Sequence, residues 1–133
     1  MERQLLTFAG IATVCDIVDL LGENRALVQM GLAEIRKTEN IGLRVLIEEA
    51  GLSDKVISEY HIGFIIGPCI NATGRLESGR LAVELFCTQD EKEAREKARH
   101  LVMLNAERKQ LTEEAAERAD IALQKGGALQ DRE

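Results

Sequence analysis

One carboxylate stands out because of the residues around it. Asp16 lies within LLTFAGIATVCDIVDLL, residues 5–21, a segment that is apolar on almost every side. A buried carboxylate is costly unless it is hydrogen-bonded, paired or bound to a metal ion. The residue types therefore leave three roles open: a helix cap formed with Thr13, an ion pair with Arg25 or Arg3, or a metal ligand. A metal site would need further ligands, which nothing else in the chain supplies.

A second candidate is the loop GPCINATGR, residues 67–75, which contains the only proline of the chain. Proline favours the end of the preceding helix, because it lacks a backbone donor and restricts the residue before it. The small residues that follow let backbone N–H groups approach a ligand, and Asn71 and Arg75 could donate to phosphate oxygens. Arg80 is a possible second basic contact. The alternative is an ordinary connector, in which Asn71 caps its own turn, Arg75 pairs with Glu77 and Arg80 is solvated.

Composition limits which ligands the chain can attract. The 133 residues carry a net charge of −6, so bulk electrostatics cannot hold nucleic acid, and any phosphate contact must be local. The three cysteines are an odd, widely spaced set without a CxxC motif, which argues against a disulfide framework and a zinc site. No apolar run reaches the roughly 18 residues of a membrane span, and no signal peptide is recognisable. These features indicate a cytoplasmic protein with no membrane partner.

Helical periodicity predicts the elements that must position these residues. We expect a mainly α fold: a compact region of about five or six helices that ends in a long C-terminal connecting helix. The segment 53–67 is the most ambiguous, since its IGFII core could also form a strand. The segments expected to be helical are 5–21, 27–35, 41–52, 53–67, 78–86 and a final helix that begins near residue 88.

The final helix is the clearest of these elements. Thr88 and Glu91 form a capping-box pattern, and no residue breaks the helix before the glycines at 126–127. About 36 helical residues would extend about 55 Å, which is longer than a globule of this size. We therefore interpret the helix as a connector or a docking surface.

The order of four segments adds a resemblance to a known family. ATVCDIVDLLGENRALVQMGL, IGLRVLIEEAGL, YHIGFIIGPCINATGRL and LAVELF…LNAERKQLTEEAAERA together resemble the RecJ-type single-strand-specific DNA exonucleases of the DHH phosphoesterase superfamily. The resemblance implies that Asp16 is a catalytic ligand of Mn²⁺ or Mg²⁺. It also implies that Asn71 and Arg75 line a groove for single-stranded DNA, and that the final helix joins two catalytic subdomains.

The same resemblance implies an internal fragment of a larger enzyme, because the family's Asp-His-His motif has no counterpart in this sequence. Residues 1–87 would be the C-terminal helical part of the catalytic subdomain, 88–125 the connector helix and 126–133 a truncated tail. The parent would hydrolyse DNA from 5′ to 3′ by two-metal chemistry, in repair and recombination. We expect the fragment to be inactive, to bind no metal alone and to self-associate. Two alternatives remain: a helical protein-interaction module, or another DHH phosphoesterase that acts on short oligonucleotides.

Overall fold

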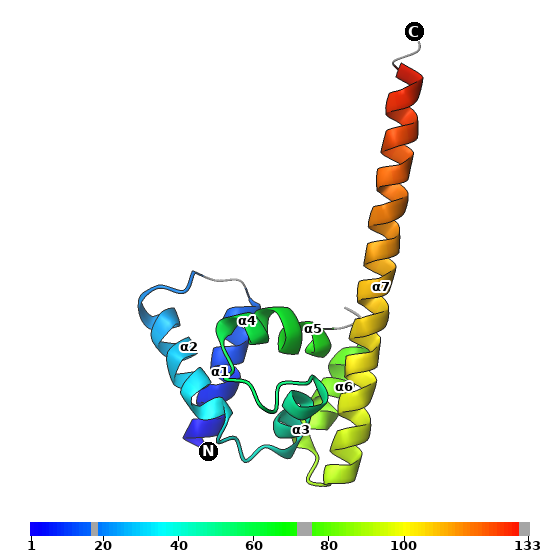
Figure 1. Ribbon diagram of the computed structural model, residues 1–133. Coiled ribbons are helices and arrows are strands. Elements are labelled where there is room, and N and C mark those ends of the chain that lie inside the picture. Colours follow the sequence, from blue (N-terminus) through cyan, green and yellow to red (C-terminus); the bar gives the residue numbers. More distant parts are fainter. Residues whose placement is uncertain (17–18, 72–75, 131–133) are drawn as a thin grey trace.

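The computed structural model describes residues 1–16, 19–71 and 76–130, and this part of the chain is helical, without a strand (Figure 1). This confirms the predicted mainly α class. Three short elements, α4, η1 and α5, follow one another without a break, so the described residues form six helical segments. The elements are α1 (Glu2–Cys15), α2 (Gly22–Ile35), α3 (Ile41–Glu49), α4 (Glu59–His61), the π-helical η1 (Ile62–Ile66), α5 (Gly67–Ile70), α6 (Leu76–Cys87) and α7 (Glu91–Gln130).

The helices form a compact region from which α7 projects (Figure 1). Helices α1 and α2 pack together on one side, and α3 and α6 pack against the beginning of α7 on the other. The α4–η1–α5 segment crosses between these two parts, in contact with α1 through η1 and with α7 through α5. None of the described helices combines the length and the hydropathy that a membrane span requires.

One aliphatic core joins these helices. Leu43, Val45 and Leu46 of α3 are fully buried. Helix α7 contributes to this core only through its first turns. Small side chains there let the neighbouring helices approach closely. The α7 residues in the core are Ala94, Ala98 and Leu101, each with no exposed surface.

The first helix is shorter and less buried than the sequence suggests. We expected one helix over residues 5–21, buried on most faces, but α1 ends at Cys15 and Asp16 is its C-terminal cap. The expected burial was wrong, because α1 packs mainly on α2 and η1 and leaves its remaining side open. Leu5, for example, is 63% exposed.

Pro68 lies inside a helical segment, contrary to the expectation that it ends the preceding helix. The segment tolerates it because the turn before it is widened into a π-helix, in which the N–H of Gly67 donates to the carbonyl of Ile62, five residues back. Proline normally clashes with the carbonyl four residues earlier and removes a donor. At the first turn of α5 the missing donor costs little.

Helix α7 begins and ends later than predicted. The predicted Thr88–Glu91 capping box was wrong, because Asp90 takes the capping position and accepts a hydrogen bond from the Lys92 N–H (3.0 Å). Thr88 instead accepts from the Asp90 N–H and donates to Glu93. The helix continues through the glycines near its end and has 40 residues, which corresponds to about 60 Å.

Charged side chains join α3 to α7 at the edge of this core. The Arg95 guanidinium donates to Glu48 at 2.8 Å and to Glu49 at 2.9 Å. Arg44 of α3 reaches Glu91 of α7 at 3.3 Å. These contacts hold the pKa of the Glu48 carboxyl below its usual value, chiefly through the hydrogen bond from Arg95. The ion pairs therefore supplement the packing of α7 against α3.

We predict that Gly42→Ala destabilises the fold by about 1–3 kcal/mol or more, because overpacking strains a filled core. A Cβ at Gly42 would overlap the backbone carbonyl of Leu85, where α3 and α6 meet. Gly79→Ala is the matched control, since nothing lies within 4 Å of its added Cβ, and alanine favours a helix by about 0.5–1 kcal/mol. Urea unfolding followed by circular dichroism measures both. Equal stability of the two variants would contradict the close approach.

We predict a second effect on stability, which depends on pH. A carboxyl with a lowered folded-state pKa stabilises the fold above its unfolded pKa and loses that contribution as pH falls through the folded pKa. Acidification should therefore reduce the free energy of unfolding less in Glu48→Gln than in the wild type. Glu107→Gln, on the exposed part of α7, is the control and should keep the wild-type pH dependence. Identical pH profiles for all three proteins would rule out this role of Glu48.

Candidate functional site: a groove between α1, α5 and α7

Two adjoining depressions form one groove across the compact region. The first, of about 510 Å³, is lined by Ala12, Thr13, Cys15, Asp16, Asn24 and Asn71. The second, of about 200 Å³, is lined by Cys15, Gly63, Gly67, Pro68, Asn71 and Arg108. Cys15 and Asn71 line both, so the two depressions adjoin each other. We call this surface the groove.

The floor of the groove is set by a close contact between α1 and the α4–η1–α5 segment. A Cβ on Gly67 would lie 2.6 Å from the sulfur of Cys15, so glycine at this position lets the Cys15 side chain pack directly against the backbone of this segment. Burial raises the pKa of the Cys15 thiol, which keeps the sulfur protonated at neutral pH. Cys15 is therefore a packing residue.

Asp16 lies at one end of the groove, directly after α1. Its side chain is exposed, and within the described part of the chain its carboxylate forms no hydrogen bond or ion pair. The helix cap with Thr13, one of the three roles left open for Asp16, is absent, because the Thr13 hydroxyl donates to the Ala9 carbonyl at 2.7 Å. The described residues contain no group of three or more His, Cys, Asp or Glu side chains that could hold a metal ion. Asp16 is thus an open carboxylate without companion ligands in that part of the chain.

Asn71 lies in the middle of the groove, immediately after α5. Its backbone N–H donates to the Gly67 carbonyl at 3.0 Å, which closes the last turn, and its side chain is exposed. The structure thus brings Asn71 and Asp16, which are 55 positions apart in the sequence, into one depression. Arg75, the other predicted contact of this loop, lies outside the described residues.

Arg108 provides a positive charge at the other end of the groove, and residue types alone did not reveal it. It comes from α7, and its side chain is exposed. With Lys109 it acts on Cys69 of α5: the thiol pKa is raised by burial, and the two cations partly offset this rise. Arg108 lies one helical turn after Asn105, whose buried side chain faces the same thiol at 3.7 Å. The signal available in the sequence was the position of Arg108 within LNAERKQ, which is part of one of the four segments that carry the family resemblance.

Arg80 lies elsewhere. Its side chain donates to Glu84 at 3.0 Å on α6 and borders a different depression, together with Leu81 and His100. Within the described residues, Asp16 and Asn71 therefore line one depression and Arg80 lines another.

Comparison with known proteins identifies the segment to which this groove belongs. No protein-family model matches the chain. The single-stranded-DNA-specific exonuclease RecJ of Bacillus subtilis (strain 168) is 35% identical over 119 residues, 90% of this chain and 15% of that protein. The RecJ protein of Thermus thermophilus is 40% identical over 105 residues, 79% of this chain and 15% of that protein.

Solved structures agree with the sequence comparison. RecJ from Thermus thermophilus in complex with Mg²⁺ superposes with a TM-score of 0.75 at 36% identity, over 85% of this chain and 18% of that chain. Exonuclease RecJ bound to manganese gives a TM-score of 0.74 at 36% identity, over 85% and 29% of the two chains. This chain is a RecJ-type segment. The resemblance inferred from the four sequence segments is confirmed.

The RecJ-type segment spans about 15% of the length of the first two relatives named above. It therefore corresponds to only part of those proteins. The solved RecJ structures include complexes with Mg²⁺ and with manganese, which agrees with the metals expected for the parent enzyme.

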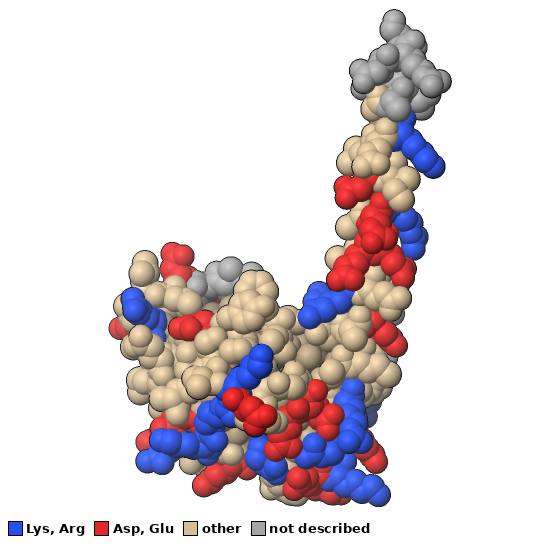
Figure 2. Space-filling view, in the orientation of Figure 1, with Lys and Arg blue, Asp and Glu red and all other residues tan. Residues whose placement is uncertain are grey.

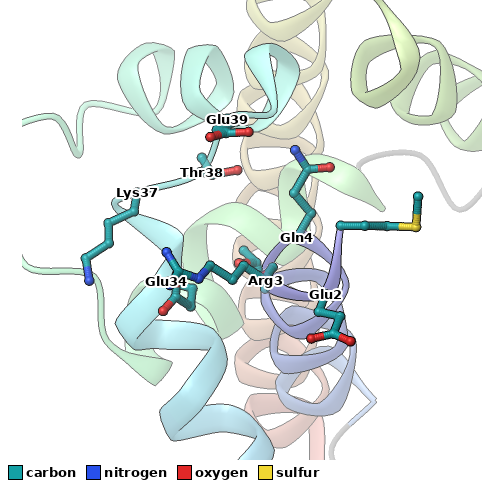
Figure 3. Close-up of a pocket in the computed structure, with 9 residues that line it drawn as sticks. Glu2, Arg3, Gln4, Glu34, Lys37, Thr38 and Glu39 are labelled. Atoms are coloured by element: carbon teal, nitrogen blue, oxygen red, sulfur yellow. The ribbon is translucent and has the colours of Figure 1, made fainter.

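A separate hollow of the RecJ-type segment lies at the opposite end of α1 (Figure 3). It has a volume of about 430 Å³ and is formed by the beginning of α1, the end of α2 and the residues after α2. Its charged lining residues are Glu2, Arg3, Glu34, Lys37 and Glu39. Acidic and basic groups are mixed around it, so its chemistry favours no particular class of ligand.

Proposed function

We propose that the RecJ-type segment is part of a metal-dependent 5′-to-3′ single-stranded-DNA exonuclease with a role in DNA repair and recombination. In this proposal it contributes one metal ligand, Asp16, and part of the groove that holds the DNA strand. The observation that carries the proposal is the position of Asp16 and Asn71 in one depression. The relatives named single-stranded-DNA-specific exonuclease supply the substrate class.

The groove offers suitable groups for a phosphate backbone despite the net charge of −6. Asn71 presents an exposed amide, and Arg108 presents a guanidinium, the side chain best suited to phosphate oxygens. Arg75 would add a second guanidinium from the loop after Asn71. Each contact is local, so the acidic balance of the whole chain does not prevent strand binding. Arg80 remains a predicted contact that the same binding assay can test.

Asp16 has the chemistry of a ligand for Mg²⁺ or Mn²⁺, which prefer carboxylate oxygens. Its carboxylate is exposed at the end of the groove and carries no partner in the described part of the chain. When bound, the metal ions activate water and stabilise negative charge on the phosphodiester. Asp16 would hold one ion next to the strand that Asn71 positions. The other ligands would come from outside this set of residues.

The proposal gives the helices distinct tasks. Residues 1–87 would form the helical part of a catalytic subdomain, 88–125 the connector to a second subdomain and 126–133 a short tail. Helix α7 suits a connector because everything after Asn105 on it is exposed or only partly buried through residue 127. A connector must hold its length without support along its sides.

A second candidate function is a helical protein-interaction module that also self-associates. The far part of α7 favours it, because three large apolar residues there are exposed: Leu111 (65%), Ile121 (52%) and Leu123 (73%). The two candidates differ in their ligand. Concentration-dependent sedimentation together with no affinity for single-stranded DNA would favour the second.

We predict that the chain binds a labelled single-stranded oligonucleotide, measured by fluorescence anisotropy, and that the groove carries this binding. Arg108→Ala should weaken it about tenfold, and its salt dependence should fall by about 0.7 in the slope of log K against log salt. Asn71→Ala and Arg75→Ala should also weaken binding. Arg118→Ala, an exposed arginine paired with Glu114 far along α7, is the matched control. Full affinity in all three groove variants would contradict the proposed groove.

We also predict that the 133-residue chain alone does not hydrolyse DNA, because one carboxylate cannot hold two metal ions. The assay incubates a radiolabelled single strand with the purified chain and Mn²⁺ or Mg²⁺. In a longer protein that contains this segment, Asp16→Asn should abolish digestion while strand binding persists. Metal-dependent digestion by the chain alone would refute the first expectation. A strong preference of the longer protein for very short strands would favour the oligonucleotide phosphoesterase.

A further inference from the structure

Two aromatic side chains form an exposed stacked pair on the α4–η1–α5 segment. The rings of Tyr60 and Phe64 have centroids 5.0 Å apart and an interplanar angle of 29°. Tyr60 is 62% exposed and Phe64 is 65% exposed. The chain has only four aromatic residues of the Phe, Tyr and Trp types, and the other two, Phe8 and Phe86, pack edge-on against each other beside the core. Two of the four Phe and Tyr residues are therefore exposed to solvent.

The pair adjoins the groove. Gly63 and Gly67 line the groove, and Phe64 follows Gly63 directly in the chain, while Tyr60 precedes Gly63 by three residues. Because neither glycine has a side chain, nothing from them stands between the rings and the groove floor. Figure 2 shows the surface over α4 and α5 as largely uncharged, with basic side chains where α7 leaves the compact region.

The Tyr60 ring also has the neighbouring His61 ring beside it. His61 meets it in an edge-to-face arrangement, with centroids 5.7 Å apart. The His61 ring is in turn fixed by its Nδ1, which accepts a hydrogen bond from the Ser58 N–H at 3.0 Å. Tyr60 is thus supported without being covered, as a preformed binding surface requires.

We propose that Tyr60 and Phe64 form a platform on which an unpaired nucleobase stacks while Asn71 and Arg108 hold the adjacent backbone. The platform rests on the proposed function of the groove and adds a contact to the bases. Stacking on aromatic rings tolerates every base, so it gives affinity without sequence preference. Bases in a duplex are already stacked on their neighbours, so the platform also favours single strands over duplexes.

The chain provides its own optical probe for this contact. Tyr60 is its only tyrosine, and it has no tryptophan, so tyrosine emission reports on the platform alone. Titration with oligothymidylate should quench this emission. An abasic oligonucleotide with the same number of phosphates should bind more weakly and leave the emission unchanged. Strand binding by anisotropy without quenching would overturn the platform but leave the groove intact.

Variants separate stacking from general apolar contact. Tyr60→Leu and Phe64→Leu should each weaken binding of oligothymidylate roughly tenfold, with little change for the abasic strand. Tyr60→Phe keeps the ring and should keep the affinity. Val83→Ala is the control, because Val83 is also 62% exposed but lies on α6, outside the groove. Circular dichroism confirms that each variant is folded.

The remaining outcomes are also decisive. An equal loss of affinity for the normal and the abasic strand would overturn the platform. Emission that changes with protein concentration in the absence of DNA would place a second copy of the chain on the rings, which also overturns it. No binding of any strand by the wild-type chain would overturn the groove and the platform together.

Discussion

The arrangement of the molecule depends on a narrow stripe near the beginning of α7. Ala94, Ala98, Leu101 and Asn105 recur at helical spacing and are all buried. The small alanines let α3 and α6 approach, while Asn105 contacts the thiol of Cys69 on α5. Helices α3, α5 and α6 therefore all pack against this stripe of α7. The stripe ends where the groove begins, because the exposed Arg108 follows Asn105 by one turn.

Ion pairs between and within these helices explain how an acidic chain can present a basic side chain to the groove. Many of the acidic residues of α3, α6 and the first turns of α7 are engaged in ion pairs with neighbouring arginines and lysines. Those pairs lie around the lower part of the compact region in Figure 2, where blue and red side chains alternate. Arg108 forms no ion pair within the described part of the chain, so its charge is available to the groove.

The sequence predicted the features that rest on local periodicity and missed those that rest on packing. The existence of α3 and of a long final helix follows from spacing alone, and residue types together with the resemblance singled out Asp16 and Asn71. The end of α1 could not be predicted, since it depends on which of its faces find a neighbour. The π-turn before Pro68 was hidden because a strand, an α-helix and a π-helix fit the same apolar run. Arg108 was missed because its role appears only when α7 lies beside α5.

The π-helical turn of η1 determines the direction in which the side chains after it point. Each residue of an α-helix advances the helix by about 100°, so one extra residue in a turn rotates the following side chains by about that angle. The widened turn of η1 therefore sets the rotation between the stacked rings and Asn71. The number of residues in this stretch, more than their identity, aims the amide at the groove. Deleting a single residue from 62–66 would keep the segment helical while pointing Asn71 away.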